Sequence, residues 1–240
     1  MDAPQSRDSD PFYVPFHTFQ SHYLSLCETW TFFQILYQEP ENVAILHEAA
    51  GLAFEQIGRS TVEHLLIQLA RLSDPEVTAG HKNLSLDAIV VEVGKCLTEP
   101  DRKIPDPYPP QKTPPPRAVR DREFLAKIEA VSAKLRPIRQ KLIQHRVKWI
   151  AHLDFEHAIN PRQKVLADLS FAEIGQAIEL VGLILVAINS YFWQVGVTYS
   201  MPPRSEKQLL SIVRLGSLAQ KQLFKQRLPL DGDFPAFAAS

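Results

Sequence analysis

Two arginines and two histidines recur at the same interval in one stretch of helix-forming sequence. His145 and His152 are seven residues apart, and so are Arg139 and Arg146. Because seven residues make about two turns of an α-helix, the members of each pair share a face. Arginine offers planar, multidentate donors to phosphate oxygens, and histidine gives or takes a proton near neutral pH. The four side chains together suit the handling of a phosphate group.

One reaction that needs only these groups is cleavage of RNA by its own neighbouring 2'-hydroxyl. Histidine would transfer a proton at the attacking or the leaving oxygen, and arginine would offset the charge on the phosphorane. The sequence has no HExxH motif, and Cys27 and Cys96 are not spaced as zinc ligands. We therefore expect neither a metal ion nor a cofactor, and we interpret both cysteines as reduced thiols in the core.

The spacing of the arginine and the histidine does not select a site by itself. An arginine followed by a histidine after four to six residues occurs three times: Arg59/His64, Arg139/His145 and Arg146/His152. The string from His145 to Asp154, HRVKWIAHLD, resembles the signature helix of HEPN domains, whose motif is Arg, four to six residues and His. Together with LARLSDP at 69–75 and KNLSL at 82–86, it is similar to the abortive-infection U-type (AbiU-like) branch of that superfamily.

This resemblance implies a fold, an assembly and an activity. HEPN domains are helical bundles, commonly symmetric dimers whose motif helices face a shared cleft, and often metal-independent endoribonucleases in phage defence or toxin systems. By carry-over, Arg146 would contact the scissile phosphate and His152 would transfer the proton. The partners expected are RNA, a second copy bound through the Arg146/His152 helix and, for a toxin, an antitoxin. The remaining polar residues expected to bind substrate are Arg139, His145, Lys148 and Asp154.

One residue departs from the family pattern. Many active members have a polar residue, often Asn, directly after the arginine, whereas this chain has Val147. A non-catalytic helical module that binds RNA, nucleotide or a protein partner is therefore the alternative function. Six residues also rotate a helix by about 600°, which leaves Arg146 and His152 about 120° apart. A homodimer would bring each arginine toward the histidine of its partner, so assembly would be a condition for activity.

The same residues also have structural interpretations. His152 fits equally well as a packed histidine near a dimer seam, and a structural role is the simpler interpretation of His145. Arg146 could form a surface ion pair, and Asp154 could orient His152 or simply end the helix. The three tryptophans lie in apolar runs, where core packing is more common than stacking on bases.

The elements that carry these residues are helices. Pro137 either kinks the motif segment or restarts it, and 138–154 should form one helix in both cases. The second segment should bend near Gly51 or Gly58, and Asn83 or Ser85 should cap the third. The predicted helical segments are about 12–38, 42–72, 87–97, 120–157, one opened by Leu169-Ser170, and 205–227.

No alternating strand pattern accompanies these helices. The sequence therefore predicts an all-α, single-domain bundle of about six helices over residues 1–240. Residues 99–117 form a proline-rich surface loop in this prediction, since eight prolines from Pro100 to Pro116 prevent regular helix. Residues 1–11 are expected to be a disordered tail, and residues 228–240 an irregular one.

The charge and hydropathy of the chain narrow its setting. Lys and Arg total 26 against 27 Asp and Glu, which argues against a broad basic surface for duplex nucleic acid. The polar N-terminus does not resemble a signal peptide. Leu180–Pro203 carries no charge and is long enough to span a bilayer, but Asn189 and other polar residues interrupt it, so we expect a buried central helix. A soluble, cytoplasmic protein follows, with a membrane-associated one as a third alternative.

Overall fold

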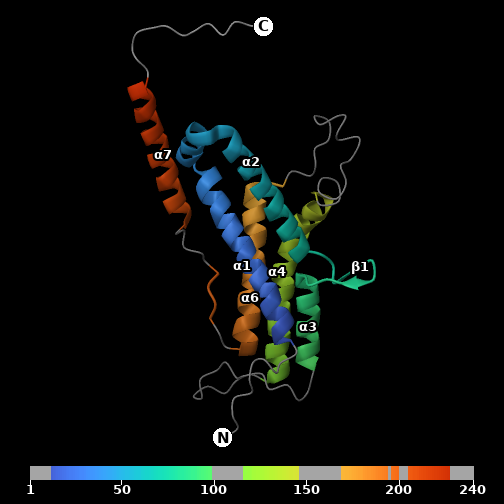
Figure 1. Ribbon diagram of the computed structural model, residues 1–240. Coiled ribbons are helices and arrows are strands. Elements are labelled where there is room, and N and C mark those ends of the chain that lie inside the picture. Colours follow the sequence, from blue (N-terminus) through green and yellow to red (C-terminus); the bar gives the residue numbers. More distant parts are fainter. Residues whose placement is uncertain (1–11, 99–115, 146–168, 194–195, 200–204, 228–240) are drawn as a thin grey trace. The chain divides into compact units, whose positions relative to one another are not determined.

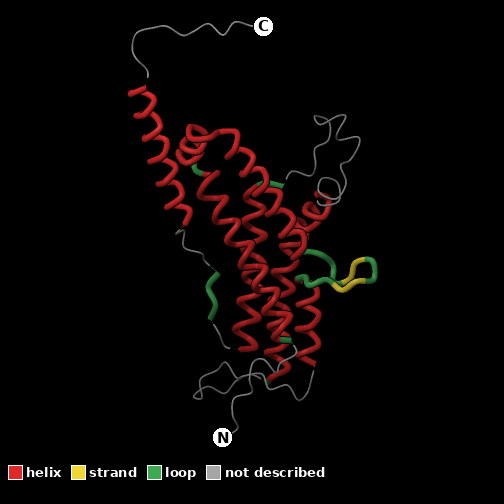
Figure 2. The backbone as a smooth tube through the Cα atoms, viewed as in Figure 1, coloured by secondary structure: helices red, strands yellow, loops and turns green. Residues whose placement is uncertain are grey.

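The computed structural model describes residues 12–98, 116–145, 169–193, 196–199 and 205–227, and these residues are mainly helical (Figures 1 and 2). The predicted all-α class is confirmed. The described elements are α1 (Tyr13–Phe33), the π-helix η2 (Gln34–Gln38), α2 (Pro40–Leu72), β1 (Val77–Thr78), β2 (His81–Lys82), α3 (Leu86–Thr98), α4 (Arg117–His145), α6 (Phe171–Trp193) and α7 (Ser205–Arg227).

The chain divides into two compact units. The first comprises residues 1–30 and 61–201, and the second comprises residues 31–60 and 202–240. The predicted single domain over 1–240 stays a prediction. The proline-rich loop and both predicted tails fall almost entirely outside the described residues.

The first unit is built on antiparallel packing of α4 and α6. The start of α4 meets the end of α6, where the rings of Phe124 and Tyr191 stack with centroids 4.0 Å apart. The end of α4 meets the start of α6 through an ion pair between Lys141 and Glu173. The seam predicted for α4 is buried at Ile128, Leu135, Ile138 and Leu142.

Residues 13–30 of α1 lie along α6 in the same unit and supply much of its aromatic core. Its predicted stripe of Phe16, Phe19, Tyr23 and Leu26 is almost fully buried. The ring of Phe16 contacts the ring of Trp193 at 4.9 Å between centroids. The hydroxyl of Tyr23 donates a hydrogen bond of 2.9 Å to the carbonyl of Ile178.

Helix α6 is the most apolar helix of the first unit. Among the described residues it is the one helix with the length and hydropathy of a membrane-spanning segment. Half of its most apolar 18-residue stretch is buried inside the protein. Eleven of its residues are buried, including Asn189. The side chain of Asn189 donates to the carbonyl of Leu185 and to the hydroxyl of Tyr199, each at 3.0 Å. The prediction of a buried helix is confirmed as far as Trp193.

The second unit has its own small core. Leu36 of the π-helix, Leu46 of α2 and Leu210 of α7 pack together. The side chain of Asn42 donates a hydrogen bond of 2.6 Å to the carbonyl of Ile35, which satisfies part of the irregular π-helical backbone. Ser217 of α7 donates to the carboxylate of Glu48 of α2 at 2.9 Å.

Several predicted helix starts, bends and breaks can be compared with the structure at prolines and glycines. Helix α2 begins at Pro40, where the fixed φ of proline suits a first helical position. It bends at Ala50 (φ −163°, ψ 67°), which confirms the bend predicted near Gly51 rather than Gly58. Helix α4 continues through Pro137, so the alternative prediction that a new helix begins at this proline is wrong. The helix predicted at 205–227 is confirmed at both ends.

The sequence did not predict the hairpin of β1 and β2. Its turn residues, Ala79 and Gly80, both have positive φ, 50° and 83°. Two-residue hairpin turns of this type usually carry Asn-Gly or Asp-Gly, a signal that Ala-Gly lacks. All four strand residues are exposed, so no period-2 hydrophobic pattern could mark the strands.

Candidate functional site

The candidate site lies on the C-terminal part of α4 and the residues that follow it. The structure describes α4 as far as the backbone of His145. Four of the predicted site residues lie outside the described residues: Arg146, Lys148, His152 and Asp154. Arg139 is the one predicted site residue whose side-chain contacts are described, and they lead to α3.

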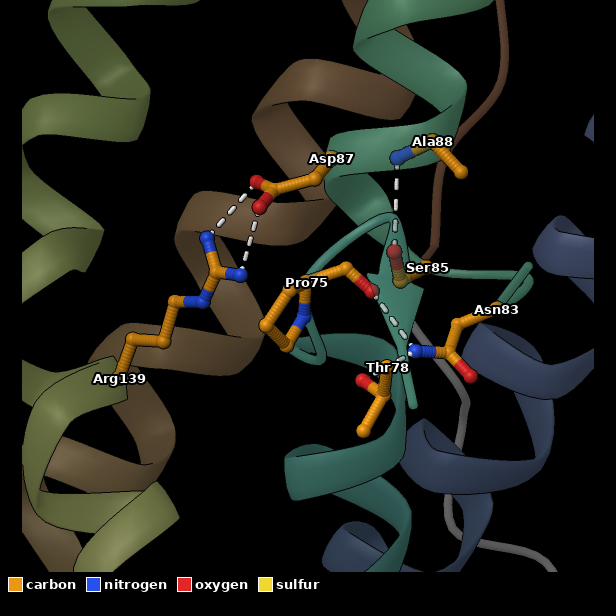
Figure 3. A network of polar contacts seen from close by, with 7 residues as sticks. All are labelled: Pro75, Thr78, Asn83, Ser85, Asp87, Ala88 and Arg139. Atoms are coloured by element: carbon orange, nitrogen blue, oxygen red, sulfur yellow. Dashed lines mark hydrogen bonds and ion pairs between the residues drawn. The ribbon is translucent and has the colours of Figure 1, made fainter. Parts of the chain in front are cut away.

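Arg139 forms a two-point ion pair with Asp87 (Figure 3). Its two terminal nitrogens donate to the two carboxylate oxygens at 2.7 and 2.6 Å. The arginine side chain is 22% exposed and the aspartate side chain 42%. The Nε of Arg139 is buried and has no hydrogen-bond partner among the residues that the structure describes. Asp87 thus occupies the fork of the guanidinium in the geometry that a phosphate would otherwise adopt.

Asp87 is placed by the first turn of α3. Ser85 caps this helix, with its hydroxyl accepting from the backbone N–H of Ala88 at 3.4 Å, which confirms one of the two predicted caps (Figure 3). A carboxylate two residues after the cap is stabilised by the positive end of the helix dipole. The start of α3 and Arg139 therefore both hold the carboxylate of Asp87 in place.

Asn83, the other predicted cap, holds the hairpin instead. Its side-chain nitrogen donates to the carbonyl of Pro75 and to the hydroxyl of Thr78, each at 2.8 Å (Figure 3). Its backbone N–H donates to the carbonyl of Glu76 at 2.7 Å. Residues 73–83 thus form a fastened loop that leads directly into α3.

A second ion pair holds α4 two residues further on. The ammonium of Lys141 lies 2.6 Å from the carboxylate of Glu173 in the first turn of α6. Glu173 and Ser170 form a capping box, in which the Ser170 N–H donates to the glutamate at 2.9 Å and the Glu173 N–H donates to the serine hydroxyl at 3.2 Å. The bond from Lys141, followed by the backbone bond from Ser170, lowers the pKa of Glu173 to about 2.

The two ion pairs lie on different sides of α4. Two residues of an α-helix turn by about 200°, so Arg139 and Lys141 point in nearly opposite directions. One reaches the N-terminus of α3 and the other the N-terminus of α6. The last described turns of α4 are consequently held between two helix starts, immediately before Arg146 in the sequence.

The described residues contain no group of three or more His, Cys, Asp or Glu side chains that could hold a metal ion. Cys27 and Cys96 are both buried and form no disulfide. Burial raises the pKa of Cys27. A thiol with a raised pKa stays protonated near neutral pH, so Cys27 is not suited to act as a reactive thiolate.

Comparison with protein families shows the family of this chain. The family model described as AbiU2, a HEPN model, matches residues 16–199. The chain belongs to the AbiU2 family of HEPN domains. No curated protein and no solved structure matches it.

The AbiU2 match extends from α1 to Tyr199 and ends before α7. It contains the whole string from His145 to Asp154 and the segments 69–75 and 82–86, so the resemblance seen in the sequence is confirmed. The family assigns the protein to the HEPN domains related to abortive infection. In this AbiU2 domain the segments 69–75 and 82–86 are joined by the hydrogen bond from Asn83 to the carbonyl of Pro75. Ser85 of the second segment caps α3, whose Asp87 binds Arg139 of α4.

Sequence reasoning missed Asp87, Lys141 and Glu173. The sequence held a partial signal for the glutamate, since Ser170 followed three residues later by Glu173 is the pattern of a capping box. It held no signal for the pairing of Asp87 with Arg139, which are 52 residues apart.

Proposed function

We propose that this AbiU2 protein is a metal-independent endoribonuclease that acts in phage defence. The observation that carries the proposal is the family match over residues 16–199, which includes the complete motif from Arg146 to His152.

The proposed reaction is an internal transfer within RNA. The 2'-oxygen attacks the neighbouring phosphorus, and the bond from phosphorus to the 5'-oxygen of the next nucleotide breaks. The products are a 2',3'-cyclic phosphate and a 5'-hydroxyl. Arg146 would offset the charge on the phosphorane, and His152 would take the proton of the 2'-hydroxyl or give one to the leaving oxygen. Water takes no part in this step, and no metal ion is needed.

We also propose the setting of this reaction. The protein would act in the cytoplasm as a homodimer through the helix that bears Arg146 and His152, with His145, Lys148 and Asp154 contacting RNA. As a toxin it would be restrained by an antitoxin. On a regular helix the arginine and the histidine would lie about 120° apart, so the dimer would complete each site.

A non-catalytic module that binds RNA, nucleotide or a protein partner is the second candidate. Val147, where many active members have a polar residue, favours it, as does the net charge of −1. The two candidates differ in whether the protein breaks RNA at all.

The test is incubation of purified protein with mixed RNA in EDTA. We expect cleavage by the wild type with cyclic phosphate ends, and loss of cleavage in His152→Ala and Arg146→Ala. His64→Ala is a matched control, because exposed His64 follows Arg59 at a similar spacing on another helix. Absence of cleavage by the wild type at concentrations that support dimers would favour the binding module.

A further inference from the structure

Helix α7 has one apolar side that packs in the second unit and another that is exposed. Leu210 belongs to the core of that unit, and Leu209 and Val213 pack against it. Ile212 and Leu215 are 66% and 67% exposed. They follow Leu210 by two and five residues, which on an α-helix are rotations of about 200° and 140°. Both side chains therefore point away from the core that holds the helix.

The exposed side borders a stripe of basic residues. Leu218 follows Leu215 by three residues and is 51% exposed, so the two are neighbours on the helix surface. Lys207, Arg214 and Lys221 recur at intervals of seven residues, which places them on one side of the helix. All three are exposed. Leu218 lies four residues after Arg214 and three before Lys221, so the basic stripe runs along the edge of the apolar one.

The charge of α7 indicates what could cover this surface. From Ser205 to Arg227 the sequence has five Lys or Arg residues and one Glu, a net charge of +4, whereas the whole chain has −1. A second copy of α7 would bring like charges together. The exposed side is also a poor coiled-coil seam, because the positions that follow Leu215 at heptad spacing are Ala219 and Gln222. An occupant with an anionic surface above an apolar layer matches both stripes.

The family fold does not account for the exposed side of α7. The AbiU2 match ends at residue 199, and α7 begins at Ser205. A Cβ added to Gly216 would meet nothing within 4 Å among the residues that the structure describes. The middle of the helix is therefore open to an external partner.

We propose that α7 docks on an anionic lipid bilayer and lies in the plane of its surface. Ile212, Leu215 and Leu218 enter the boundary between headgroups and acyl chains, and Lys207 and Arg214 meet the lipid phosphates. Basic amphipathic helices of this length bind membrane surfaces in this way. The long stems of the basic residues cover apolar surface while their charges reach the headgroups. This inference is independent of the proposed ribonuclease activity.

The experiment measures the partition of the full-length protein onto two kinds of vesicle. One kind is phosphatidylcholine alone, and the other is an equal mixture of phosphatidylcholine and phosphatidylglycerol. The apolar variant is Ile212→Gln with Leu215→Gln, and the charge variant is Lys207→Gln with Arg214→Gln. Both variants replace exposed side chains, so their thermal midpoints should stay close to that of the wild type.

A matched control separates this surface from any exposed leucine. Leu183 is 49% exposed on α6, a helix without Lys or Arg, and Leu183→Gln removes it. Lys221 is left intact in the charge variant, because it also pairs with Glu48.

We expect the wild type to bind the anionic vesicles and to bind the neutral ones at least about tenfold more weakly. Each basic residue near an anionic surface contributes about fivefold to the partition coefficient, so the charge variant should lose about 25-fold. The loss should shrink at high salt. The apolar variant should lose at least about tenfold, and Leu183→Gln should stay within about twofold of the wild type.

Four results would overturn the inference. The first is a wild type that does not bind anionic vesicles, and the second is an equal loss in Leu183→Gln. The third is a dimer in solution that dissociates in the apolar variant without vesicle binding by the wild type, which would assign the surface to a second copy. The fourth is RNA binding that falls only in the charge variant, again without vesicle binding, which would assign the basic stripe to RNA. Should the apolar variant unfold, the charge variant alone decides.

Discussion

The hydroxyl of Tyr23 on α1 lies against the bare backbone of Gly182 on α6. A Cβ placed on Gly182 would overlap the hydroxyl oxygen and lie 3.2 Å from the Cζ of the ring. The glycine thus leaves the space from which the hydroxyl reaches the carbonyl of Ile178, at 2.9 Å. Burial raises the pKa of Tyr23, so this hydroxyl keeps its proton for that bond.

Gly182→Ala should therefore destabilise the protein despite the better helix propensity of alanine. We expect a loss of about 1–3 kcal/mol in the free energy of unfolding, because the added methyl displaces the tyrosine and breaks its hydrogen bond. Urea denaturation measures the change. Gly94→Ala on α3 is the control, since a Cβ there meets open space, and it should stabilise by about 0.5–1 kcal/mol. Adding Tyr23→Phe to Gly182→Ala should cost less than the sum of the single changes; strict additivity would contradict the contact.

Tyr199→Phe should loosen the segment after α6. The Tyr199 hydroxyl accepts hydrogen bonds from Gln20 at 2.7 Å and from Asn189 at 3.0 Å. Its removal leaves a largely buried amide without one partner, and we expect a loss of about 1–2 kcal/mol by urea denaturation. If the bond to Gln20 matters, a double-mutant cycle of Tyr199→Phe with Gln20→Ala will show coupling, whereas zero coupling energy would refute it.

Tyr199 should also make stability depend on alkaline pH. Burial is the main reason that the pKa of Tyr199 rises from 10.0 to about 12. A raised folded-state pKa gives stability that is complete below the unfolded value of 10.0 and is lost as the pH rises toward about 12. Unfolding measured between these values should be less steeply dependent on pH in Tyr199→Phe. Identical slopes for the two proteins would contradict the shift.

Glu173 should respond at the other end of the pH scale. Its pKa falls from 4.5 to about 2, mainly through Lys141. A lowered pKa gives stability that is present above 4.5 and is lost as the pH falls toward 2. Titration of the carboxylate by NMR should show the low pKa in the wild type and a higher one in Lys141→Gln. Lys221→Gln is the control, since Lys221 pairs with Glu48; an equal effect of both variants on Glu173 would exclude Lys141 as the cause.

Ala79→Gly should stabilise the hairpin. Ala79 has a φ of 50°, a left-handed conformation that costs an L-residue about 1–2 kcal/mol and glycine almost nothing. Part of this gain is offset by the greater freedom of glycine in the unfolded chain, so we expect about 0.5–1 kcal/mol. Ala88→Gly in the first turn of α3 should have the opposite sign by thermal unfolding. A loss of stability in both variants would contradict the strain at Ala79.

The helices could be predicted from the sequence because each has an apolar face at helical spacing, as Ile128, Leu135 and Leu142 show for α4. Helix caps that depend on the type of one residue, such as Ser85, could also be predicted from the sequence. The π-helix at 34–38 and the hairpin were not, since neither carries a periodic or turn signal. Arg139 was recognised as a residue with chemistry, but its partner Asp87 was not, because such a pairing exists only after α3 and α4 have packed.

The hairpin also offers a place to attach a label. Its four strand residues and both turn residues are exposed, so the buried core does not depend on them. Asn83 fastens the base of the loop through Pro75 and Thr78, which isolates the tip from the start of α3. A short epitope or fluorophore inserted between Ala79 and Gly80 should therefore be tolerated. Such a reporter would sit on the exposed loop that leads into α3 and Asp87.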